Sequence, residues 1–593
     1  MTIVVVVSAS GLGIGREIAT HLDATLHGQF SDCDVLIENY ASHLIALFKE
    51  QNSIVFVGAL GILIRLIAPV ITKKKYDPPV IAIAENGSTV IPVLGGHSGA
   101  NSLASELASF LNCPAAITTA GDLHFNVALD APPKGWHLRN PENYKKFMAT
   151  LLKGESIRLL GSLPWLSDTS LPFSKTGILS IHATEKIMPL EPFSLIYNPE
   201  CLAIGIGCER NTSAEEVINL VTTTLSKNNL CPESIAALVS IDLKMDEKAL
   251  HKVASVFKRP LRFFSAKTLE LETPRLLNPS NIVFEEVGCH GVSEAAALAA
   301  TGPDGQLIVP KEKSERATCA IAKFSGVLNP NSIGLPRGKL FVIGTGPGKQ
   351  EWLTPEALHL VKSSSDLVGY TLYLNLLGKA TNGKIKHEYK LGEERDRVIK
   401  ALNIASEGKT VSLISSGDPG IYAMASLVFD CLNDFNKAEW NRLEIVVSPG
   451  ISAVQACAAK VGAPLGHDFC AISLSDLLTP WSVIEKRLKA AAHGDFVVAL
   501  YNPASQKRRT QLKKAIEILR SERQAKTPVI IGKSLGRPEE KLEITTLQYF
   551  NPQSVDMLSI VIVGSTQTQV TNGKVFTPRG YLPNGIYREK YLK

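Results

Sequence analysis

Gly338 to Pro347 reads GKLFVIGTGP, and Ser412 to Tyr422 reads SLISSGDPGIY. Each stretch is a short apolar run that ends in a glycine-containing turn, which is typical of a buried β-strand and the turn that follows it. After the first stretch, Thr354 suits the cap of a helix and Pro355 suits its first position. The two stretches therefore predict strand-turn-helix units of an α/β sheet.

The first glycine-rich turn lacks the signature of a nucleotide phosphate site. No Gly-Lys-Ser or Gly-Lys-Thr closes it, and Pro347 removes one of the amide donors that a phosphate would need. On its own, such a turn is an ordinary connection between a strand and a helix.

Three more predicted strands end in turns with glycine, proline or asparagine: Leu443 to Val447, Phe496 to Tyr501 and Val529 to Ile531. Ligands of open α/β sheets lie beyond the carboxyl ends of the strands, so five such ends can meet at one crevice. The pattern predicts a binding site built from turns.

The order of these motifs resembles the tetrapyrrole-type, class III S-adenosylmethionine methyltransferases. The motifs are GTGPG, LTPEA, SSGDPGIYAMA, SPGISAVQACAAKVGAPLGHDF, YNP and a closing IVG, and they run from Lys339 toward the C-terminus. Within that family, GHDFCAISLSDLLTPW, at Gly466 to Trp481, is most similar to the enzymes that methylate carbon 17 of precorrin-3B and contract its ring. Methylation at carbon 11, or of diphthine, stays open as an alternative.

The resemblance implies a cofactor pocket for S-adenosylmethionine. A sulfonium methyl group is already activated, so the protein mainly positions it against the accepting carbon and excludes water. The pocket residues implied by the family are Gly344, Gly346, Pro347, Gly417, Asp418, Ile421, Ser452, Ala453, Tyr501 and Gly532.

Asp418 is also a candidate catalytic carboxylate, and the alternative is a turn or helix cap. Ring contraction needs proton transfers, for which His467, Asp468 and Tyr422 are the candidates. The sequence does not choose among these three residues. The family further implies a homodimer formed through this half of the chain.

The composition predicts several folded domains. The chain has 593 residues, of which 45% are hydrophobic and only 6% aromatic. The most apolar stretch, Ile54 to Val70, is interrupted by Arg65, so no membrane span is expected. The N-terminus has neither a basic leader nor a cleavage site, which predicts a cytoplasmic protein.

None of the ten cysteines forms a Cys-x-x-Cys pair, so no protein-bound metal is expected, and any cobalt would be carried by the substrate. The net charge is +6, with basic clusters at 73–75 and 507–509. No nucleic-acid recognition motif accompanies these clusters, whereas they suit a tetrapyrrole substrate fringed with carboxylates.

The N-terminal turn, Ser10 to Gly15, reads SGLGIG after a run of valines. Its spacing is G-x-G-x-G and not G-x-G-x-x-G, and no acidic residue ends a second strand at the usual distance. A dinucleotide site is therefore disfavoured, and a tight turn before a helix explains the glycines.

Other phrases in the first half of the chain resemble the cobalamin-pathway proteins that open the δ-lactone of cobalt-precorrin-5A and release acetaldehyde. The resemblance covers roughly residues 1 to 125 and 200 to 325. It is carried by GILIRLIAP (Gly61 to Pro69), GGHSGAN (Gly95 to Asn101), GCERNTSAEE (Gly207 to Glu216), SIDLK (Ser240 to Lys244) and VSEAAAL (Val292 to Leu298).

Lactone opening needs a base for water and a group that stabilises the developing oxyanion. His97 is the candidate base, and Arg65 is the candidate clamp for a substrate carboxylate. As alternatives, His97 caps its helix and Arg65 pairs with Glu85. Glu209, Asp242 and Glu294 are weaker candidates that also suit helix caps. A corrinoid-binding module without chemistry is the rival function for this half.

The predicted fold is α/β and multidomain, with a two-lobed tetrapyrrole methylase fold in the C-terminal half and α/β domains in the N-terminal half. The expected segments are a lactone-hydrolase-like N-terminal domain (1–128), a middle domain or connector (129–198), a lactone-hydrolase-like C-terminal domain (199–326), a linker (327–337) and two methyltransferase lobes (338–465 and 466–593).

Overall fold

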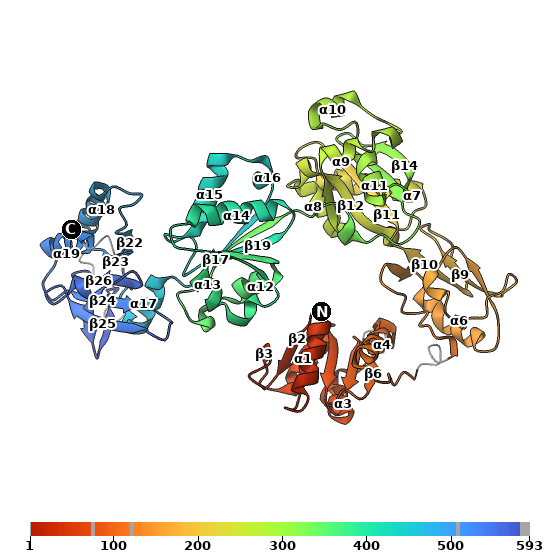
Figure 1. Ribbon diagram of the computed structural model, residues 1–593, viewed down its shortest axis with the longest axis horizontal. Coiled ribbons are helices and arrows are strands. Elements are labelled where there is room, and N and C mark those ends of the chain that lie inside the picture. The colour runs from red at the N-terminus through yellow and green to blue at the C-terminus, as the bar shows by residue number, and fades with distance from the viewer. Residues whose placement is uncertain (1, 73–76, 119–123, 506–509, 581–593) are drawn as a thin grey trace. The chain divides into compact units, whose positions relative to one another are not determined.

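The computed structural model describes residues 2–72, 77–118, 124–505 and 510–580, and the basic clusters at 73–75 and 507–509 lie outside these ranges. The chain forms two compact units. Unit 1 contains residues 1–241 and 248–334, and unit 2 contains residues 242–247 and 335–593. In the described ranges no helix is long and apolar enough to cross a membrane. The predicted multidomain α/β class is confirmed (Figure 1).

The first sheet of unit 1 is doubly wound. Its strand order is β3-β2-β1-β4-β5-β6, and β6 is antiparallel to β5 whereas the other neighbours are parallel. Helices α1 and α4 pack on one face, and α2 and α3 on the other. The elements are β1 (Thr2–Val6), α1 (Leu12–His21), β2 (Thr25–Gly28), β3 (Val35–Leu36), α2 (Tyr40–Lys49), β4 (Ser53–Val57), α3 (Leu60–Ile67), β5 (Val80–Ile83), β6 (Val90–Leu94) and α4 (Ala100–Leu111).

The strand order of this sheet reverses between β1 and β4. The chain leaves β1 toward α1 on one face and leaves β4 toward α3 on the opposite face. Loops that diverge in this way leave a crevice at the carboxyl edge of an open sheet. Residues 7–11 after β1 and Glu85 after β5 emerge at this edge.

Unit 1 contains two more sheets, each with its own packed core. The second has the order β7-β10-β9-β8, and the third has the order β13-β12-β11-β15-β14. Phe147 and Tyr197 are fully buried in the core of the second sheet. The elements are β7 (Trp136–Leu138), α6 (Tyr144–Leu151), β8 (Ile157–Leu160), β9 (Leu179–Ala183), β10 (Ser194–Pro199), β11 (Leu202–Cys208), α7 (Ala214–Lys227), β12 (Ile235–Ile241), α8 (Lys248–Phe257), β13 (Leu261–Phe264), α9 (Ala266–Glu270), α10 (Asn281–Val287), α11 (Ser293–Thr301), β14 (Gln306–Lys313) and β15 (Ala317–Lys323).

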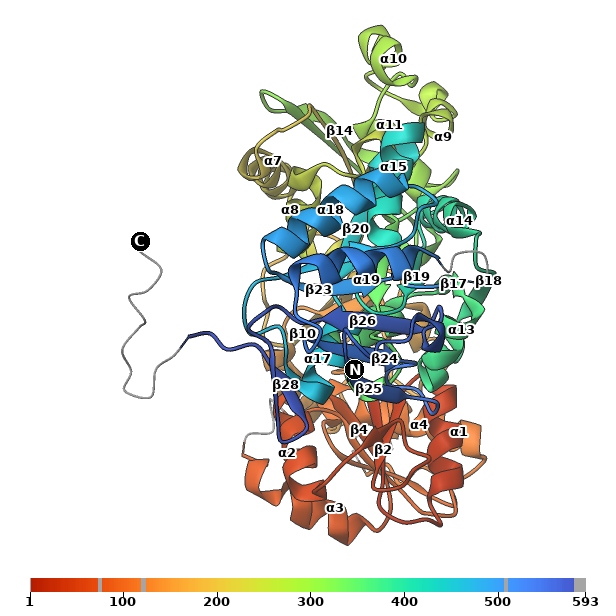
Figure 2. The same ribbon diagram turned by 90° about the vertical axis from the view of Figure 1, so that its left-hand side faces the viewer.

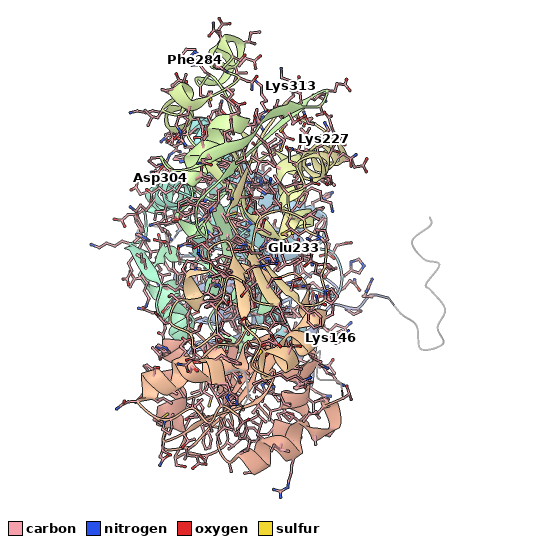
Figure 3. All side chains as sticks on the ribbon, turned by 90° about the vertical axis from the view of Figure 1, so that its right-hand side faces the viewer. Lys146, Lys227, Glu233, Phe284, Asp304 and Lys313 are labelled. Carbon is pink, nitrogen blue, oxygen red and sulfur yellow. The ribbon has the colours of Figure 1, made fainter. Side chains whose placement is uncertain are left out.

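The alanine-rich helix α11 is buried against the third sheet. A Cβ atom on Gly205 of β11 would lie 1.8 Å from the carbonyl oxygen of Ser293, so only glycine permits this approach. Helix α10 carries Phe284 (Figure 3). The ring of Phe284 stacks on that of His290 with 4.4 Å between the ring centroids.

Glu294, in the first turn of α11, holds two loops in place. Its side chain is buried, and its carboxylate accepts hydrogen bonds from the amides of Leu277 (2.9 Å), Asn278 (3.0 Å) and Lys311 (2.9 Å) and from the Asn278 side chain (2.8 Å). Burial alone would raise the pKa of Glu294, but these donors outweigh it and lower the pKa. This carboxylate is saturated with protein donors, which is the pattern of a structural anchor.

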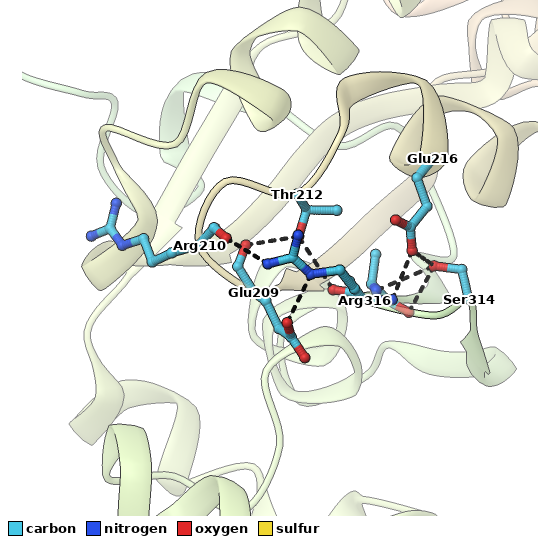
Figure 4. A network of polar contacts seen from close by, with 7 residues as sticks. Glu209, Arg210, Thr212, Glu216, Ser314 and Arg316 are labelled. Carbon is cyan, nitrogen blue, oxygen red and sulfur yellow. Dashed lines mark hydrogen bonds and ion pairs between the residues drawn. The ribbon is translucent and has the colours of Figure 1, made fainter.

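The GCERNTSAEE motif is tied to the turn between β14 and β15 (Figure 4). Arg316 donates to the Glu209 carboxylate at 2.9 Å, and Glu216 accepts from Ser314 at 2.5 Å and from the Arg316 amide at 2.7 Å. The hydrogen bond from Ser314, followed by that from the Arg316 amide, lowers the pKa of Glu216. Glu209 and Glu216 of the motif therefore bind a neighbouring turn.

The first sheet of unit 2 is parallel, with the order β18-β17-β19-β16-β20. Helices α14 and α15 pack on one face, and α12 and α13 on the other. The elements are β16 (Lys339–Gly344), α12 (Pro355–Ser363), β17 (Asp366–Tyr370), α13 (Thr371–Leu376), β18 (Ile385–Tyr389), α14 (Glu394–Ser406), β19 (Thr410–Ser415), α15 (Met424–Phe435), α16 (Ala438–Asn441), β20 (Glu444–Ser448) and α17 (Ala453–Val461).

The second sheet of unit 2 is mixed, with the order β22-β23-β26-β24-β25. Helices α18 and α19 lie side by side on one face (Figure 2), and α17 packs on the other face. The elements are β22 (Phe469–Ser473), α18 (Trp481–His493), β23 (Val497–Tyr501), α19 (Thr510–Glu522), β24 (Pro528–Lys533), β25 (Lys541–Thr546) and β26 (Ser559–Val563), and a small sheet joins β21 (Gly462–Ala463), β28 (Lys574–Phe576) and β27 (Gln569–Thr571).

We predict that Glu294→Gln destabilises the third sheet by about 3 kcal/mol, because an amide nitrogen would face buried N–H donors in place of an acceptor. Hydrogen exchange of the segments around Asn278 and Lys311 measures this loss. Glu315→Gln, an exposed change in the β14–β15 turn, is the control and should alter stability by less than about 0.5 kcal/mol.

The lowered pKa of Glu294 adds a pH dependence. The stabilising contribution of the Glu294 carboxylate is fully present above the ordinary glutamate pKa of 4.5 and is lost as the pH falls through the lowered pKa. The difference in free energy of unfolding between wild type and Glu294→Gln should therefore become smaller at acidic pH. If the difference in free energy of unfolding stays constant through acidic pH, Glu294 does not stabilise the protein as an ionised carboxylate.

Candidate functional site

Three loops meet at the carboxyl edge of the parallel sheet in unit 2. The sheet order places β16 between β19 and β20, so the loops that follow these strands are neighbours. Backbone hydrogen bonds join the first two loops: the Thr345 amide donates to the Ser415 carbonyl at 2.9 Å, and Gly346 and Gly417 exchange bonds of 3.2 and 2.9 Å. The edge of the site is thus made of main chain.

The absence of side chains is a steric requirement at this edge. A Cβ atom on Gly344 would lie 2.6 Å from the Gly417 carbonyl oxygen and 2.7 Å from the Gly450 amide nitrogen. A Cβ atom on Gly450 would lie 2.2 Å from the same Gly417 oxygen. We call Gly344, Gly346, Gly417 and Gly450 the glycine cradle.

At Gly417 the backbone conformation, and not a steric contact, favours glycine. Its φ of +68° favours glycine, but a Cβ atom there would meet no heavy atom closer than 3.9 Å. The nearest atoms belong to Ile451, Ser452 and Ala453, so a methyl-sized space lies between the Gly417 loop and the start of α17. Space bounded by bare backbone suits a ligand that is held by main-chain groups.

Asp418 braces the cradle. One carboxylate oxygen accepts from the Gly420 amide at 2.8 Å, and the other accepts from the Gly450 amide at 3.2 Å. The carboxylate therefore fixes its own turn and links the loop after β19 to the loop after β20. Its predicted catalytic role stays a prediction.

Ser452 and Ala453 begin α17. Ser452 caps the helix through a capping box with Gln455. The hydroxyl of Tyr501, at the end of β23, accepts a hydrogen bond from the Val454 amide at 3.2 Å. Burial raises the pKa of Tyr501, and the bond from Val454 offsets part of that rise. The second sheet thus supplies Tyr501 to the start of this helix.

Ile421 and Tyr422 follow the Gly417 loop and are exposed. Tyr422 has a φ of +50°, which is uncommon for a residue with a bulky side chain. Its ring centroid lies 5.3 Å from that of Tyr501, and its hydroxyl donates to the Ala471 carbonyl of β22 at 2.7 Å. About half of the Tyr422 side chain is exposed, and the burial of the remainder raises the pKa of Tyr422. Tyr422 therefore lies beside the cofactor-site candidates.

His467 and Asp468 lie elsewhere on the same sheet. They form a local pair with 3.3 Å between ring nitrogen and carboxylate, and both side chains are more than half exposed. They precede Phe469, whereas Ser473, at the other end of β22, pairs with Tyr501. At about 3.3 Å per residue, these two ends of β22 are about 13 Å apart. The structure does not bring His467 to the glycine cradle.

Gly532 lies within a strand and not in a turn after it. β24 continues to Lys533 because Gly532 pairs with Leu542 and Ile560 on the neighbouring strands. A Cβ atom on Gly532 would lie 2.8 Å from the sulfur of Cys457. The absence of a side chain at Gly532 therefore allows α17 to pack closely against the sheet. The expected turn at this position was wrong, and the cofactor contact of Gly532 remains a prediction.

The loop after β24 reaches the first lobe. Arg537 donates to the carbonyl of Pro347 at 3.3 Å, and Trp352 lies between the ammonium groups of Lys349 (5.9 Å) and Lys460 (5.5 Å). Sequence reasoning missed the contact between Arg537 and Pro347, because residues nearly two hundred positions apart carry no shared local signal. It also missed Gly450, although the Ser448-Pro449-Gly450 turn marks that position.

In unit 1, the structure places Arg65 on the exposed side of α3, with its guanidinium close to the first turn of that helix, near Gly61. Arg65 and Glu85 do not form an ion pair within the described part of the chain; Glu85 instead accepts from Ser10 at 2.5 Å. His97 lies in a 3₁₀ turn, Gly96–Ser98, directly before α4. Asp242 begins a 3₁₀ turn, Asp242–Lys244, after β12.

Three family models match this chain. The model for Cobalamin synthesis G N-terminal matches residues 42–122, that for Cobalamin synthesis G C-terminus matches residues 202–322, and that for Tetrapyrrole (Corrin/Porphyrin) Methylases matches residues 339–550. The fusion expected from the sequence motifs is confirmed.

Curated relatives match the methylase part along nearly their whole length. A precorrin-3B C(17)-methyltransferase of Sinorhizobium sp is 45% identical over 249 residues, which are 41% of this chain and 97% of the relative. A probable cobalt-factor III C(17)-methyltransferase of Salmonella typhimurium is 45% identical over 242 residues, 41% of this chain and 99% of the relative. The crystal structure of the methyltransferase CobJ is 40% identical, with 41% of this chain and 100% of that chain covered and a TM-score of 0.39.

These matches and the motifs that carry them show that the chain belongs to the tetrapyrrole (corrin/porphyrin) methylase family and carries the cobalamin synthesis G regions in front of its methyltransferase.

Proposed function

We propose that residues 338–593 transfer a methyl group from S-adenosylmethionine to carbon 17 of precorrin-3B or cobalt-factor III and contract the ring. We further propose that residues 1–326 open the δ-lactone of cobalt-precorrin-5A. The observation that carries the first proposal is the glycine cradle in a chain that is 45% identical to a C(17)-methyltransferase over 97% of that relative's length.

The residues at the cradle fit the proposed cofactor. S-adenosylmethionine, when bound, supplies an activated methyl group. The bare backbone of Gly344, Gly346 and Gly417 and the start of α17 would hold it through main-chain groups. Pro347, Ile421 and Tyr501 would shape the pocket and exclude water. The few charged groups at this edge suit a transfer that depends on position and not on acid-base catalysis.

Ring contraction also needs proton transfer, for which Tyr422, His467 and Asp468 are the candidates. Of these, Tyr422 lies nearest the proposed cofactor site. It lies beside Tyr501, whereas His467 and Asp468 lie beyond the other end of β22. Backbone strain at a non-glycine residue with positive φ clusters at functional sites, because surrounding contacts must maintain it. We therefore assign the proton transfer to the Tyr422 hydroxyl.

The proposed division of labour follows the segments expected from the sequence: hydrolase regions at 1–128 and 199–326, a middle region at 129–198, a linker at 327–337 and methyltransferase lobes at 338–465 and 466–593. The positions of the sheets support this division, because each sheet of unit 1 and each main sheet of unit 2 falls within one segment, apart from Pro199 at the end of β10. Substrate-borne cobalt, a homodimer and a cytoplasmic location stay predictions.

Product analysis tests both activities on the full-length protein. With precorrin-3B or cobalt-factor III and labelled S-adenosylmethionine, we expect one methyl group at carbon 17 and a contracted ring by mass spectrometry and NMR. With cobalt-precorrin-5A, we expect acetaldehyde. Methylation elsewhere would overturn the first assignment, and methylation without acetaldehyde formation would make the first half a corrinoid-binding module.

Gly417→Ala should weaken S-adenosylmethionine binding at least tenfold, because the new methyl group enters the space beside Ile451. Isothermal titration calorimetry measures this change. Gly383→Ala is the matched control: Gly383 has a φ of +70°, and a Cβ atom there would meet no heavy atom within 4 Å. Both variants should therefore lose about 1–2 kcal/mol of stability through the same backbone strain. Equal affinity in the two variants would exclude the cradle as the cofactor site.

Tyr422→Phe should leave methyl transfer largely intact and slow ring contraction by about 100-fold, the size typical of a lost acid-base group. Accumulation of a methylated, uncontracted product measures the effect. Tyr549→Phe, an exposed tyrosine in the same unit, should behave as wild type. If His467→Gln blocks contraction and Tyr422→Phe does not, the assignment to Tyr422 is wrong.

A further inference from the structure

Unit 1 contains a polar cluster that the sequence motifs did not reveal. The Ser10 hydroxyl donates to the Glu85 carboxylate at 2.5 Å, and the hydroxyl oxygens of Ser8 and Ser10 lie 3.0 Å apart. The Gly11 amide donates to the Ser8 hydroxyl at 3.3 Å. We call Ser8, Ser10 and Glu85 the serine–glutamate cluster.

The cluster lies at the point where the sheet order reverses. Ser8 and Ser10 belong to the loop between β1 and α1, and Glu85 follows β5. The parallel pairing of β1 with β4 and of β4 with β5 brings these loops to one edge, where open α/β sheets bind their ligands. A contact between residues 75 positions apart therefore forms where a substrate would lie.

The cluster is open to a ligand. Ser10 is exposed, Ser8 and Glu85 are half-buried, and a Cβ atom on Gly13, at the start of α1, would meet no heavy atom within 4 Å. Gly58, after β4, has a φ of +155°, and a Cβ atom there would lie 2.6 Å from a Val7 methyl, so this glycine keeps the two loops close. At this edge of the sheet the loops are tightly packed at Gly58 and Val7, whereas Ser10 and the space beside Gly13 are accessible.

The charges at this edge suit an ester that also carries carboxylates. Hydrogen bonds from Ser10 and then Ser8 hold the pKa of Glu85 below its ordinary value, so the carboxylate is ionised at neutral pH. A carboxylate has about four acceptor sites, so it can accept from a water molecule while it holds Ser10. The guanidinium of Arg65 lies by the first turn of α3, which follows β4 at the same edge.

We propose that the serine–glutamate cluster is the water-activating site of the lactone hydrolase, with Glu85 as general base and Ser8 and Ser10 as positioning residues. This inference rests on the proposed lactone opening by residues 1–326. It assigns the base to Glu85 where the sequence had suggested His97.

The proposed step is the addition of water to the lactone carbonyl. Glu85 takes one proton from water as the water oxygen bonds to the carbonyl carbon. The bond from that carbon to the ring oxygen then breaks, and the ring oxygen receives the proton from Glu85. The products of this step are a carboxyl group and a hydroxyl group. Acetaldehyde leaves in a later step, in which the hydroxyl loses its proton, the bond from its carbon to the macrocycle breaks and the macrocycle keeps the electron pair, so no oxidant, reductant or metal is consumed. Arg65 would bind a peripheral carboxylate of the corrinoid during this step.

The test uses the full-length protein, cobalt-precorrin-5A and acetaldehyde release. Glu85→Gln should lower kcat at least about 100-fold with little change in KM, because the amide oxygen still accepts from Ser10 but cannot take a proton. Exogenous formate should restore part of the activity of Glu85→Ala, which a purely structural role would not allow. Glu17→Gln, exposed on α1, is the control and should match wild type.

The outcomes separate this inference from the function on which it rests. If wild type forms no acetaldehyde, the lactone hydrolase proposal fails, and the role of Glu85 fails with it. If wild type is active and Glu85→Gln stays within about threefold of it, only the assignment of the base is overturned. Loss of activity in both Glu85 variants without rescue by formate, together with a lower thermal midpoint, would also overturn it in favour of a structural role.

Discussion

The close approach of three backbone turns in unit 2 is the constraint on which the proposed methyltransferase site depends. The Gly417 carbonyl oxygen would lie within 2.6 Å of a Cβ atom on Gly344 and within 2.2 Å of one on Gly450. These contacts are possible only because both residues lack a side chain, and they leave main-chain groups as the lining of the site. Asp418 then locks the arrangement by accepting from amides on two of the turns. A site of this kind recognises its ligand through shape and through backbone hydrogen-bonding groups. This suits a methyl donor such as S-adenosylmethionine, whose methyl group is already activated and needs only to be positioned.

Both units contain a sheet in which neighbouring strands are distant in the sequence. In unit 1 the strand order reverses between β1 and β4, and in unit 2 β16 lies between β19 and β20 although the chain visits β17 and β18 in between. At both places loops from strands distant in the sequence meet at a carboxyl edge. The side chains delivered there differ: unit 2 presents glycines and one braced aspartate, whereas unit 1 presents two hydroxyls and a carboxylate. These different surfaces suit the two proposed reactions, transfer of an activated methyl group and activation of water.

Much of the architecture could be predicted from local patterns, since apolar runs followed by glycine turns mark the strand ends after β16, β19 and β20. The family resemblance supplied the rest of the methylase fold and the two cobalamin synthesis G regions. Local patterns failed where tertiary pairing decides the outcome. Gly532 continues a strand because it pairs in register with residues of two neighbouring strands, and Glu294 anchors two loops although its position at a helix start looked like an ordinary cap. The Ser10–Glu85 contact joins two motifs that share no sequence signal, so only the folded sheet reveals it.

Two tyrosines, one after β19 and one at the end of β23, contact each other beside the proposed methyltransferase site. Tyr501 of the second sheet accepts from the amide of Val454 at the start of α17, and Tyr422 from the loop after β19 donates to the Ala471 carbonyl of β22. Each bond is worth about 1 kcal/mol. Their rings also contact each other at 5.3 Å between centroids. Because α17 packs on the second sheet, separation of the two main sheets of unit 2 would break the Tyr422–Ala471 bond and the ring contact but not the bond from Val454 to Tyr501. The strained backbone of Tyr422 is then maintained by the contacts on both sides of it, which is the condition under which such strain persists.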